Sequence, residues 1–177
     1  MKIGIVSDTH RNREYLHKAV DFLMLKHKIA ALYHLGDDYD DVQDLGEKHL
    51  EVVQVPGVYD ERYRNGSLPA KVSETVLGLQ ILLVHTIDKD LTAEDIAKSD
   101  IILHGHTHKA EIRLDDGDLY VNPGHLKGKL DKNMHPSFGL LGIEDNQVTI
   151  KIFSLDKLEE IQAMTLIRSE SGLYRSS

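Results

Sequence analysis

The stretch Ile101-Ile102-Leu103-His104-Gly105-His106-Thr107-His108 decides how the rest of the chain is interpreted. Its apolar run predicts a buried strand, and Gly105 frees the backbone to turn directly after it. Residues two apart in an extended segment point to the same side, so His106 and His108 can face one point in space. Two imidazoles on one rigid loop lose little freedom when they bind a metal. A His-x-His pair also occurs on ordinary solvated loops. Whether this pair binds a metal therefore depends on which residues follow the other predicted strands.

Length and composition predict one compact globular domain. A chain of 177 residues can bury a sizeable core, and its hydrophobic (41%) and charged (28%) fractions are globular values. The formal charge of −8 repels polyanions, so neither a nucleic acid polymer nor an anionic membrane is an expected partner. The lack of cysteine excludes thiolate ligands and disulfides and fits the cytoplasm, where we expect the protein to be located.

The first third of the chain alternates apolar runs with helical patterns. Strand, helix and strand in this order predict an α/β fold in which parallel strands are joined by a right-handed crossover. Asn12 is a candidate cap for the first helix. The predicted strands are 2–7, 30–35 and 51–55, the predicted helices are 14–28 and 42–49, and the polar segment 61–69 is expected to be irregular.

Most of the remaining chain is predicted to form pairs of strands. Turn residues separate apolar runs at Gly78, at 115–118 and at Asp145-Asn146. Thr92 followed by Asp95 predicts the start of a helix. We expect hairpins over 71–84, 110–122 and 138–153, a helix over 91–98, a loop over 124–136, a final helix over 155–166 and a loose tail over 168–177.

Residues that can bind metal follow several of the predicted strands. The carboxyl ends of strands in an open α/β sheet line one crevice, so these side chains are expected to converge. Two carboxylates and four imidazoles suit Mn²⁺, Fe²⁺, Ni²⁺, Co²⁺ or Zn²⁺ better than Ca²⁺ or Mg²⁺. Six ligands exceed the needs of one ion, which predicts two adjacent ions that share a carboxylate and clamp a phosphate ester. The candidate ligands are Asp8, His10, Asp37, His85, His106 and His108.

The motifs that carry these residues resemble the calcineurin-like metallophosphoesterases, and most closely their small phosphodiesterases of the YfcE type. The resemblance runs from Met1 to about Leu155. It implies a four-layer α/β (α+β) sandwich of two mixed β-sheets flanked by helices. The implied domain spans 1–155, with a C-terminal helix and tail over 156–177 packed on or extending from it. The motifs are Asp8-Thr9-His10, Gly36-Asp37, Pro56-Gly57-Val58-Tyr59-Asp60, His85, Gly105-His106-Thr107-His108 and Asn122-Pro123-Gly124.

The resemblance also implies a reaction and a role for each ligand. A small phosphate ester, most of all a phosphodiester, would be hydrolysed by in-line attack of a metal-bound hydroxide. Two divalent ions would be the cofactors, with Mn²⁺ or Ni²⁺ favoured and Zn²⁺ or Fe²⁺ as alternatives. Asp8, His10 and His108 would bind the first ion, Asp37 would bridge, and His85 with His106 would bind the second, so that Asp37, His85 and His106 also serve catalysis.

The chain departs from the family pattern at Val58. Family members carry an asparagine here, whose oxygen binds the second ion, and valine offers no such ligand. In addition, Tyr59 stands where many members have a histidine, Thr86 replaces a usual glycine and His125 replaces a frequent serine. We therefore expect the first metal position to fill readily and the second to be labile.

The same departure keeps a rival function open, that of a catalytically degenerate scaffold or protein-interaction module. The retromer subunit that shares this fold works by binding partners. A large exposed apolar patch near Leu158, Ile161 and Leu166 would favour this function. The sequence identifies neither the substrate nor the native metal, and it leaves the oligomeric state open, with a homodimer as one alternative.

Other residues near the motifs have two interpretations each. Arg11 can contact a substrate phosphate or lie solvated at the surface. His34 and His104 are expected to pack within their strands, with support of a metal ligand as the alternative. Asn122 can orient a ligand histidine or only start its Asn-Pro turn. The lysines of the 124–136 loop can steer an anion or lie solvated; they are Lys127, Lys129 and Lys132.

Overall fold

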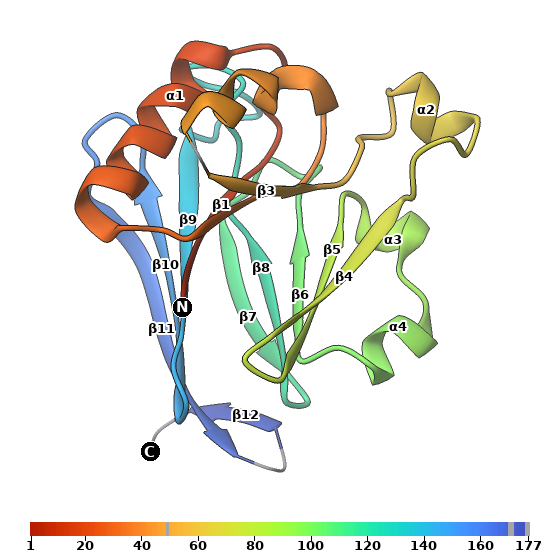
Figure 1. Cartoon of the computed structure of the whole chain (residues 1–177), viewed down its shortest axis with the longest axis vertical. Coiled ribbons are helices and arrows are strands. Elements are labelled where there is room, and N and C mark those ends of the chain that lie inside the picture. Colours follow the sequence, from red (N-terminus) through yellow and green to blue (C-terminus); the bar gives the residue numbers. More distant parts are fainter. Residues whose placement is uncertain (49, 170–171, 176–177) are drawn as a thin grey trace.

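Two β-sheets pack face to face, and helices cover the outer face of each (Figure 1). This computed structural model describes residues 1–48, 50–169 and 172–175. The order of layers is helices, sheet, sheet, helices, which confirms the predicted four-layer sandwich of two mixed sheets. Among the described residues, no helix is both long and apolar enough to span a membrane.

The first sheet has seven strands in the order β12-β11-β10-β9-β1-β2-β3. The three strands predicted in the first third of the chain pair in parallel, and the others are antiparallel. The predicted hairpin around Asp145-Asn146 forms between β9 and β10. The bounds are β1 (Lys2–Val6), β2 (Ala31–His34), β3 (Glu51–Gln54), β9 (Ser137–Ile143), β10 (Gln147–Ser154), β11 (Glu160–Ser169) and β12 (Gly172–Arg175).

The second sheet has five strands in the order β4-β5-β6-β8-β7. Strands β5, β6 and β8 are parallel, whereas β4 and β7 are antiparallel edges. The hairpins predicted around Gly78 and around 115–118 are both present. The bounds are β4 (Lys71–Val76), β5 (Leu79–Val84), β6 (Ile101–His104), β7 (Glu111–Asp115) and β8 (Asp118–Asn122).

Helices α1 and α4 begin at the predicted caps. Tyr15 donates its backbone N–H to the Asn12 side chain at 3.2 Å, and Thr92 with Asp95 forms a capping box. The expected helix over 42–49 is a 3₁₀ helix that begins earlier, and His49 lies outside the described residues. Two one-turn helices, α2 and α3, were not predicted. The bounds are α1 (Arg13–Phe22), the π-helix η1 (Leu23–His27), the 3₁₀ helix η2 (Tyr39–Lys48), α2 (Glu61–Arg64), α3 (Ile87–Asp90) and α4 (Ala93–Ala97).

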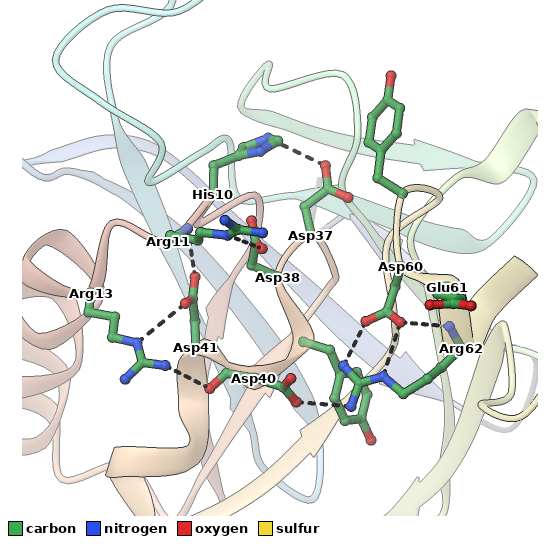
Figure 2. A pocket seen from close by; sticks show the side chains of 12 residues that line it. His10, Arg11, Arg13, Asp37, Asp38, Asp40, Asp41, Asp60, Glu61 and Arg62 are labelled. Atoms are coloured by element: carbon green, nitrogen blue, oxygen red, sulfur yellow. Dashed lines mark hydrogen bonds and ion pairs between the residues drawn. The ribbon is translucent and has the colours of Figure 1, made fainter.

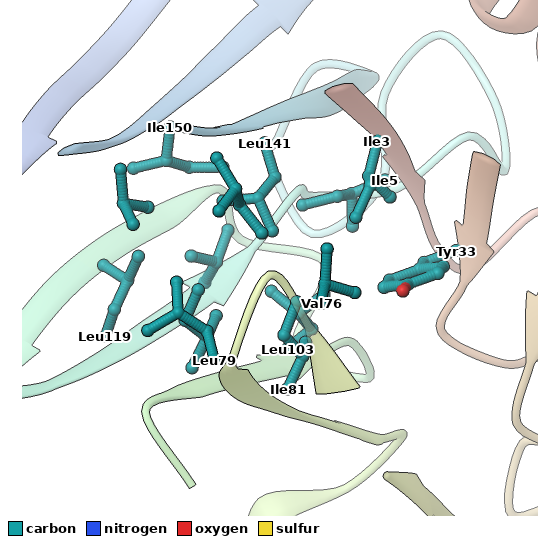
Figure 3. Close-up of a cluster of buried hydrophobic side chains, with 14 of the residues drawn as sticks. Ile3, Ile5, Tyr33, Val76, Leu79, Ile81, Leu103, Leu119, Leu141 and Ile150 are labelled. Carbon is teal, nitrogen blue, oxygen red and sulfur yellow. The ribbon is translucent and has the colours of Figure 1, made fainter. Parts of the chain in front are cut away.

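The main core lies between the sheets, where Ile3 and Ile5 of β1 belong to one apolar cluster with Leu103 of β6 (Figure 3). A second cluster joins α1 to the outer face of the first sheet, and a third joins α3 and α4 to the second sheet. Strands β1, β2 and β6 are therefore buried on both faces, which explains why their sequences are continuous apolar runs.

The predicted helix over 155–166 is wrong. Leu158 adopts a left-handed φ of 57°, which ends any helix, and the chain turns there into β11. β11 pairs along the length of β10 and carries the fully buried Leu166 into the core between the sheets. The loose tail is also wrong where it is described, because β12 pairs with β11. Residues 170–171 and 176–177 of that tail lie outside the described residues.

Candidate metal centre

Backbone hydrogen bonds join the loop that follows β1 to the loop that follows β2, and the loop that follows β5 to the loop that follows β6. Asp8 donates its N–H to the Gly36 carbonyl at 3.0 Å, and Gly105 donates its N–H to the His85 carbonyl at 3.1 Å. The carboxyl ends of parallel strands lie at the same end of each sheet, and the His106 N–H donates to Asp8 Oδ2 at 3.1 Å, so the loops at these ends of the two sheets meet. The six candidate ligands therefore come from one small region.

Five of the six candidate ligands have a left-handed backbone. A positive φ costs a residue other than glycine roughly 1 to 3 kcal/mol and persists only where the surroundings impose it. Such residues collect at functional sites, so this cluster is a physical mark of a site. The φ values are 52° at Asp8, 46° at His10, 55° at Asp37, 68° at His106 and 65° at His108.

Four ligand atoms converge on one point. One ligand atom each from Asp8, His10, Asp37 and His108 lies within 4.8 Å of every other. His108 Nε2 is 3.0 Å from Asp8 Oδ1, and His10 Nε2 is 3.3 Å from Asp37 Oδ2 and 3.4 Å from His108 Nε2. These rings and carboxylates aim their lone pairs into one shared space, as a metal position requires.

Asp37 faces a second group of ligands with its other oxygen. Asp37 Oδ1 lies 3.5 Å from His85 Nε2. His85 Nδ1 is 2.7 Å from the Leu35 carbonyl, which can only accept, so Nδ1 donates and Nε2 is the nitrogen that faces Asp37. The His106 ring centroid is 5.2 Å from that of His85. The two oxygens of Asp37 thus point to different histidines, His10 and His85; the contact with His10 is drawn in Figure 2.

Two buried atoms of the site lack a hydrogen bond. Asp8 Oδ1 and His85 Nε2 are shielded from solvent and have no hydrogen-bond partner among the described residues. A buried acceptor without a partner is costly, and a bound cation removes that cost. Imidazole and carboxylate together also match the preference of mid-row divalent ions. The residues present therefore fit a divalent metal.

The pKa directions agree with a charged Asp8. Burial alone would raise the pKa of this carboxyl, but contact with His108 and the hydrogen bond from Ser7 Oγ oppose burial, and the pKa lies below its usual value. Burial alone would lower the pKa of His108, but Asp8 and Asp131 outweigh it and raise that pKa. The contact between Asp8 and His108 thus lowers the pKa of the carboxyl and raises the pKa of the imidazole.

Glycines let the loops approach the ligands closely. A Cβ at Gly57 would overlap Asp37 Oδ1 and crowd the Asp37 backbone, and a Cβ at Gly105 would overlap Ser7 Oγ. Val58, directly after Gly57, is only partly buried. The turn therefore approaches Asp37 through its glycine, next to the position where family members place their asparagine ligand.

Two supporting carboxylates were missed by sequence reasoning. Buried Asp41 accepts from Thr9 Oγ1 at 2.6 Å and from the Arg11 N–H at 2.8 Å, which holds the loop that carries Asp8 and His10. Asp131 Oδ2 lies 2.5 Å from His108 Nδ1. Neither residue belongs to a motif. Proximity along the chain to Gly36-Asp37 was a weak signal for Asp41, and nothing in the sequence singled out Asp131.

A pocket of about 930 Å³ opens beside the centre (Figure 2). Its arginines are engaged with carboxylates: Arg11 Nε lies 3.1 Å from Asp38, and Arg62 pairs with both Asp60 and Asp40. Arg11 nevertheless keeps 85% of its side chain exposed. The lining consists of His10, Arg11, Arg13, Asp37, Asp38, Tyr39, Asp40, Asp41, Tyr59, Asp60, Glu61 and Arg62.

Several other residues that had two interpretations from the sequence lie close to the candidate ligands and are not among them. His34 and His104 are buried, as expected, and burial lowers the pKa of His34 to about 4. Asn122 Nδ2 donates to the Gly105 carbonyl at 2.9 Å, while its Oδ1 accepts from the Gly124 N–H. Asn122 therefore both supports the loop that bears the histidines and starts its own turn. Lys127 pairs with Asp131 at 2.8 Å, so it is not simply solvated.

Comparison with known proteins places this arrangement in a family. Residues 1–146 match the calcineurin-like phosphoesterase superfamily domain. The chain is 24% identical over 162 residues to "Phosphodiesterase MJ0936" of Methanocaldococcus jannaschii, covering 83% of this chain and 96% of that protein.

Solved structures show the same fold. YfcE, a phosphoesterase from E. coli, has a TM-score of 0.68 at 20% identity, covering 93% of this chain and 98% of that one. A Vps29 single mutant from Entamoeba histolytica has a TM-score of 0.72 at 24% identity, covering 96% and 100%. Wild-type Vps29 of that organism, solved in complex with Zn²⁺, has a TM-score of 0.64 at 22% identity, covering 94% and 99%. The family match spans most of the chain, and on that ground the protein belongs to the calcineurin-like phosphoesterase superfamily.

Proposed function

We propose that this phosphoesterase hydrolyses phosphodiester bonds at a centre for two divalent ions, of which the second is held more weakly. One observation carries the proposal: ligand atoms of Asp8, His10, Asp37 and His108 converge within 4.8 Å. The phosphodiesterase named above is the curated relative that supports the reaction. When bound, the ions would supply positive charge for the phosphate and acidify an attacking water.

Each of the six candidate ligands has a proposed role in holding the two ions. Asp8, His10 and His108 would hold the first ion, and His85 with His106 the second. Asp37 would bridge, a role supported by its two oxygens, which face His10 and His85 separately at 3.3 and 3.5 Å. Asp37, His85 and His106 would thereby orient the attacking water. Mn²⁺ or Ni²⁺ remains our preferred metal by resemblance, and Zn²⁺ is supported by the zinc complex of a fold relative.

Arg11 is proposed to contact the substrate phosphate. It follows His10, lines the pocket and exposes most of its side chain, and within the described part of the chain its guanidinium is engaged only through Nε, with Asp38. A guanidinium offers several N–H donors in a fixed fork, so its outer nitrogens can reach a phosphate oxygen. The pocket volume of about 930 Å³ suits a small organic ester. A cytoplasmic location and a homodimer stay predictions from the sequence.

The scaffold function is the second candidate, because the fold matches Vps29 and Val58 lacks a ligand atom. The apolar patch that would favour it does not form: Leu166 is fully buried, and Leu158 packs partly against the core of the first sheet. Ile161 alone of the three is exposed, at 51%. The catalytic function is therefore better supported.

The decisive experiment is hydrolysis of bis(4-nitrophenyl) phosphate by metal-stripped protein titrated with Mn²⁺, Ni²⁺ and Zn²⁺. We expect metal-dependent turnover that is lost in Asp37→Ala and in His108→Ala, and a raised KM with a smaller change in kcat for Arg11→Met. Folding of each variant is checked by circular dichroism. No turnover by the folded wild type at any metal concentration would favour the scaffold instead.

Weak binding at the second position is tested by Val58→Asn. The new amide oxygen restores the ligand that the family pattern carries, so half-maximal activity should require several-fold less metal. Metal content after dialysis provides the independent readout: we expect about one retained ion per wild-type chain. Two tightly retained ions in the wild type would show that the second position needs no asparagine.

A further inference from the structure

We propose that Asp131 is a positioning residue for the metal centre, which orients His108 so that its Nε2 faces the first metal position. The inference rests on the proposed function, since it concerns the same centre. It assigns a role to a residue that no motif contains and that lies 23 positions from His108 in the chain.

The contact geometry defines the orientation of the ring. His108 Nδ1 lies 2.5 Å from Asp131 Oδ2, while Nε2 on the opposite side lies 3.0 Å from Asp8 Oδ1. A carboxylate accepts hydrogen bonds, so Nδ1 donates to Asp131, and Nε2 is the nitrogen left to face the metal position. An imidazole that is held in this way loses less freedom on binding and is a stronger donor to a metal.

Asp131 is itself held in place. Lys127 Nζ lies 2.8 Å from Asp131 Oδ1, so each carboxylate oxygen has its own partner. The Asp131 backbone exchanges two hydrogen bonds with Met134, at 3.0 and 2.7 Å. His125 Nε2 in turn lies 3.0 Å from the Met134 carbonyl. The carboxylate is therefore prepositioned for His108 by the loop itself.

The loop is also anchored to the segment that directly follows β1. The Leu126 N–H donates to the carbonyls of Ser7 and Asp8, both at 3.2 Å. The His125 ring packs against the His108 ring with centroids 5.3 Å apart. The loop that carries Asp131 is therefore bound to the segment that carries Asp8. This holds the Asp131 carboxylate and the His108 ring in a fixed relative position.

A simple structural role is the alternative, in which Asp131 only pairs with Lys127 to shape the loop. Three substitutions separate the two roles. Asp131→Leu removes the acceptor at similar volume, and Asp131→Asn keeps an acceptor oxygen without the charge. Lys127→Met removes the ion pair of the loop and leaves the contact between Asp131 and His108 intact.

The measurement is the affinity of the full-length protein for Mn²⁺ and Co²⁺, obtained by competition with a chromophoric chelator and by the Co²⁺ absorption spectrum. We expect Asp131→Leu to bind the first ion about 10- to 100-fold more weakly, Asp131→Asn to lose about threefold or more, and Lys127→Met to stay within about threefold. Thermal unfolding without metal tests whether each variant is folded. If Asp131→Leu does not fold, Asp131→Asn carries the test.

The outcomes distinguish this inference from the proposed function. Wild-type affinity in the folded Asp131 variants would overturn the inference alone, and so would an equal loss in Lys127→Met, because that would trace the effect to the shape of the loop. A wild type that binds neither metal would overturn the proposed function and this inference together.

Discussion

At the scale of single residues, the centre depends on positions where side chains are absent as much as on its ligands. Gly57 lies so close to Asp37 that a methyl group would overlap its Oδ1. Left-handed φ values at Asp8, His10 and Asp37 aim the carboxylates and the ring into one space at a local energetic cost. Backbone shape therefore sets the ligand geometry.

Gly57→Ala is expected to reduce kcat/KM for the nitrophenyl diester by about 100-fold, because a shift of the Asp37 carboxylate by an ångström would spoil the alignment of the reacting groups in the proposed reaction. The matched control is Gly128→Ala, where no atom lies within 4 Å of the added methyl group and φ is ordinary. Full activity in Gly57→Ala would show that Asp37 can move without cost.

At the scale of elements, β11 shows how pairing overrides a local pattern. Leu155, Leu158, Ile161 and Leu166 have spacing that suits a helix, yet Glu160–Ser169 pairs with β10. An unpaired β10 would leave its outer backbone groups without partners, and β11 satisfies them while it buries Leu166. The strand is thus an integral part of the first sheet.

Leu166→Ala should therefore lower the free energy of unfolding by about 3 kcal/mol, through lost burial and a residual cavity. Ile161→Ala, on the same strand but half exposed, should change it by less than about 0.5 kcal/mol. Urea unfolding measured for both variants provides the comparison. Similar small effects at the two positions would argue against a core position for Leu166.

At the scale of the whole molecule, the loops at the carboxyl ends of the parallel strands of both sheets bring together polar groups that are far apart in sequence. His10 and His108 are 98 positions apart, and their Nε2 atoms lie 3.4 Å apart. Behind them, His34 is fully buried, and desolvation is the main reason that its pKa falls to about 4 from 6.5. Buried neutral histidine links global stability to pH.

The lowered pKa of His34 determines whether stability rises or falls with pH. Between pH 6.5 and 4 the unfolded chain takes up a proton at His34 and the folded protein does not, so stability falls as the pH falls through this window. We expect His34 to contribute a loss of about 2 kcal/mol between pH 7 and pH 5. Urea unfolding at both pH values should show a smaller loss in His34→Gln. An equal loss in the variant would mean that other groups cause the dependence.

The resemblance of the motifs to a known family implied the sandwich architecture, whereas the sequence by itself determined most strands and the set of candidate ligands. These features are local: apolar runs, turn residues and caps act within a few positions, and each candidate ligand comes at or shortly after the end of a strand. The carboxyl ends of parallel strands lie at the same end of a sheet. The order of strands and helices therefore also predicted that these candidate ligands converge.

Only the tertiary structure decided which neighbours complete those local features. Asp131 reaches His108, Asp41 holds the loop of His10, and β11 becomes a strand because of partners that are distant in the chain. No local pattern predicts these contacts. The sequence around a carboxylate in a lysine-rich loop looks the same whether the carboxylate is solvated or bound to a histidine. The physical reasons are the hydrogen bonds from Leu126 to Ser7 and Asp8, and the edge that β10 would leave unpaired without β11.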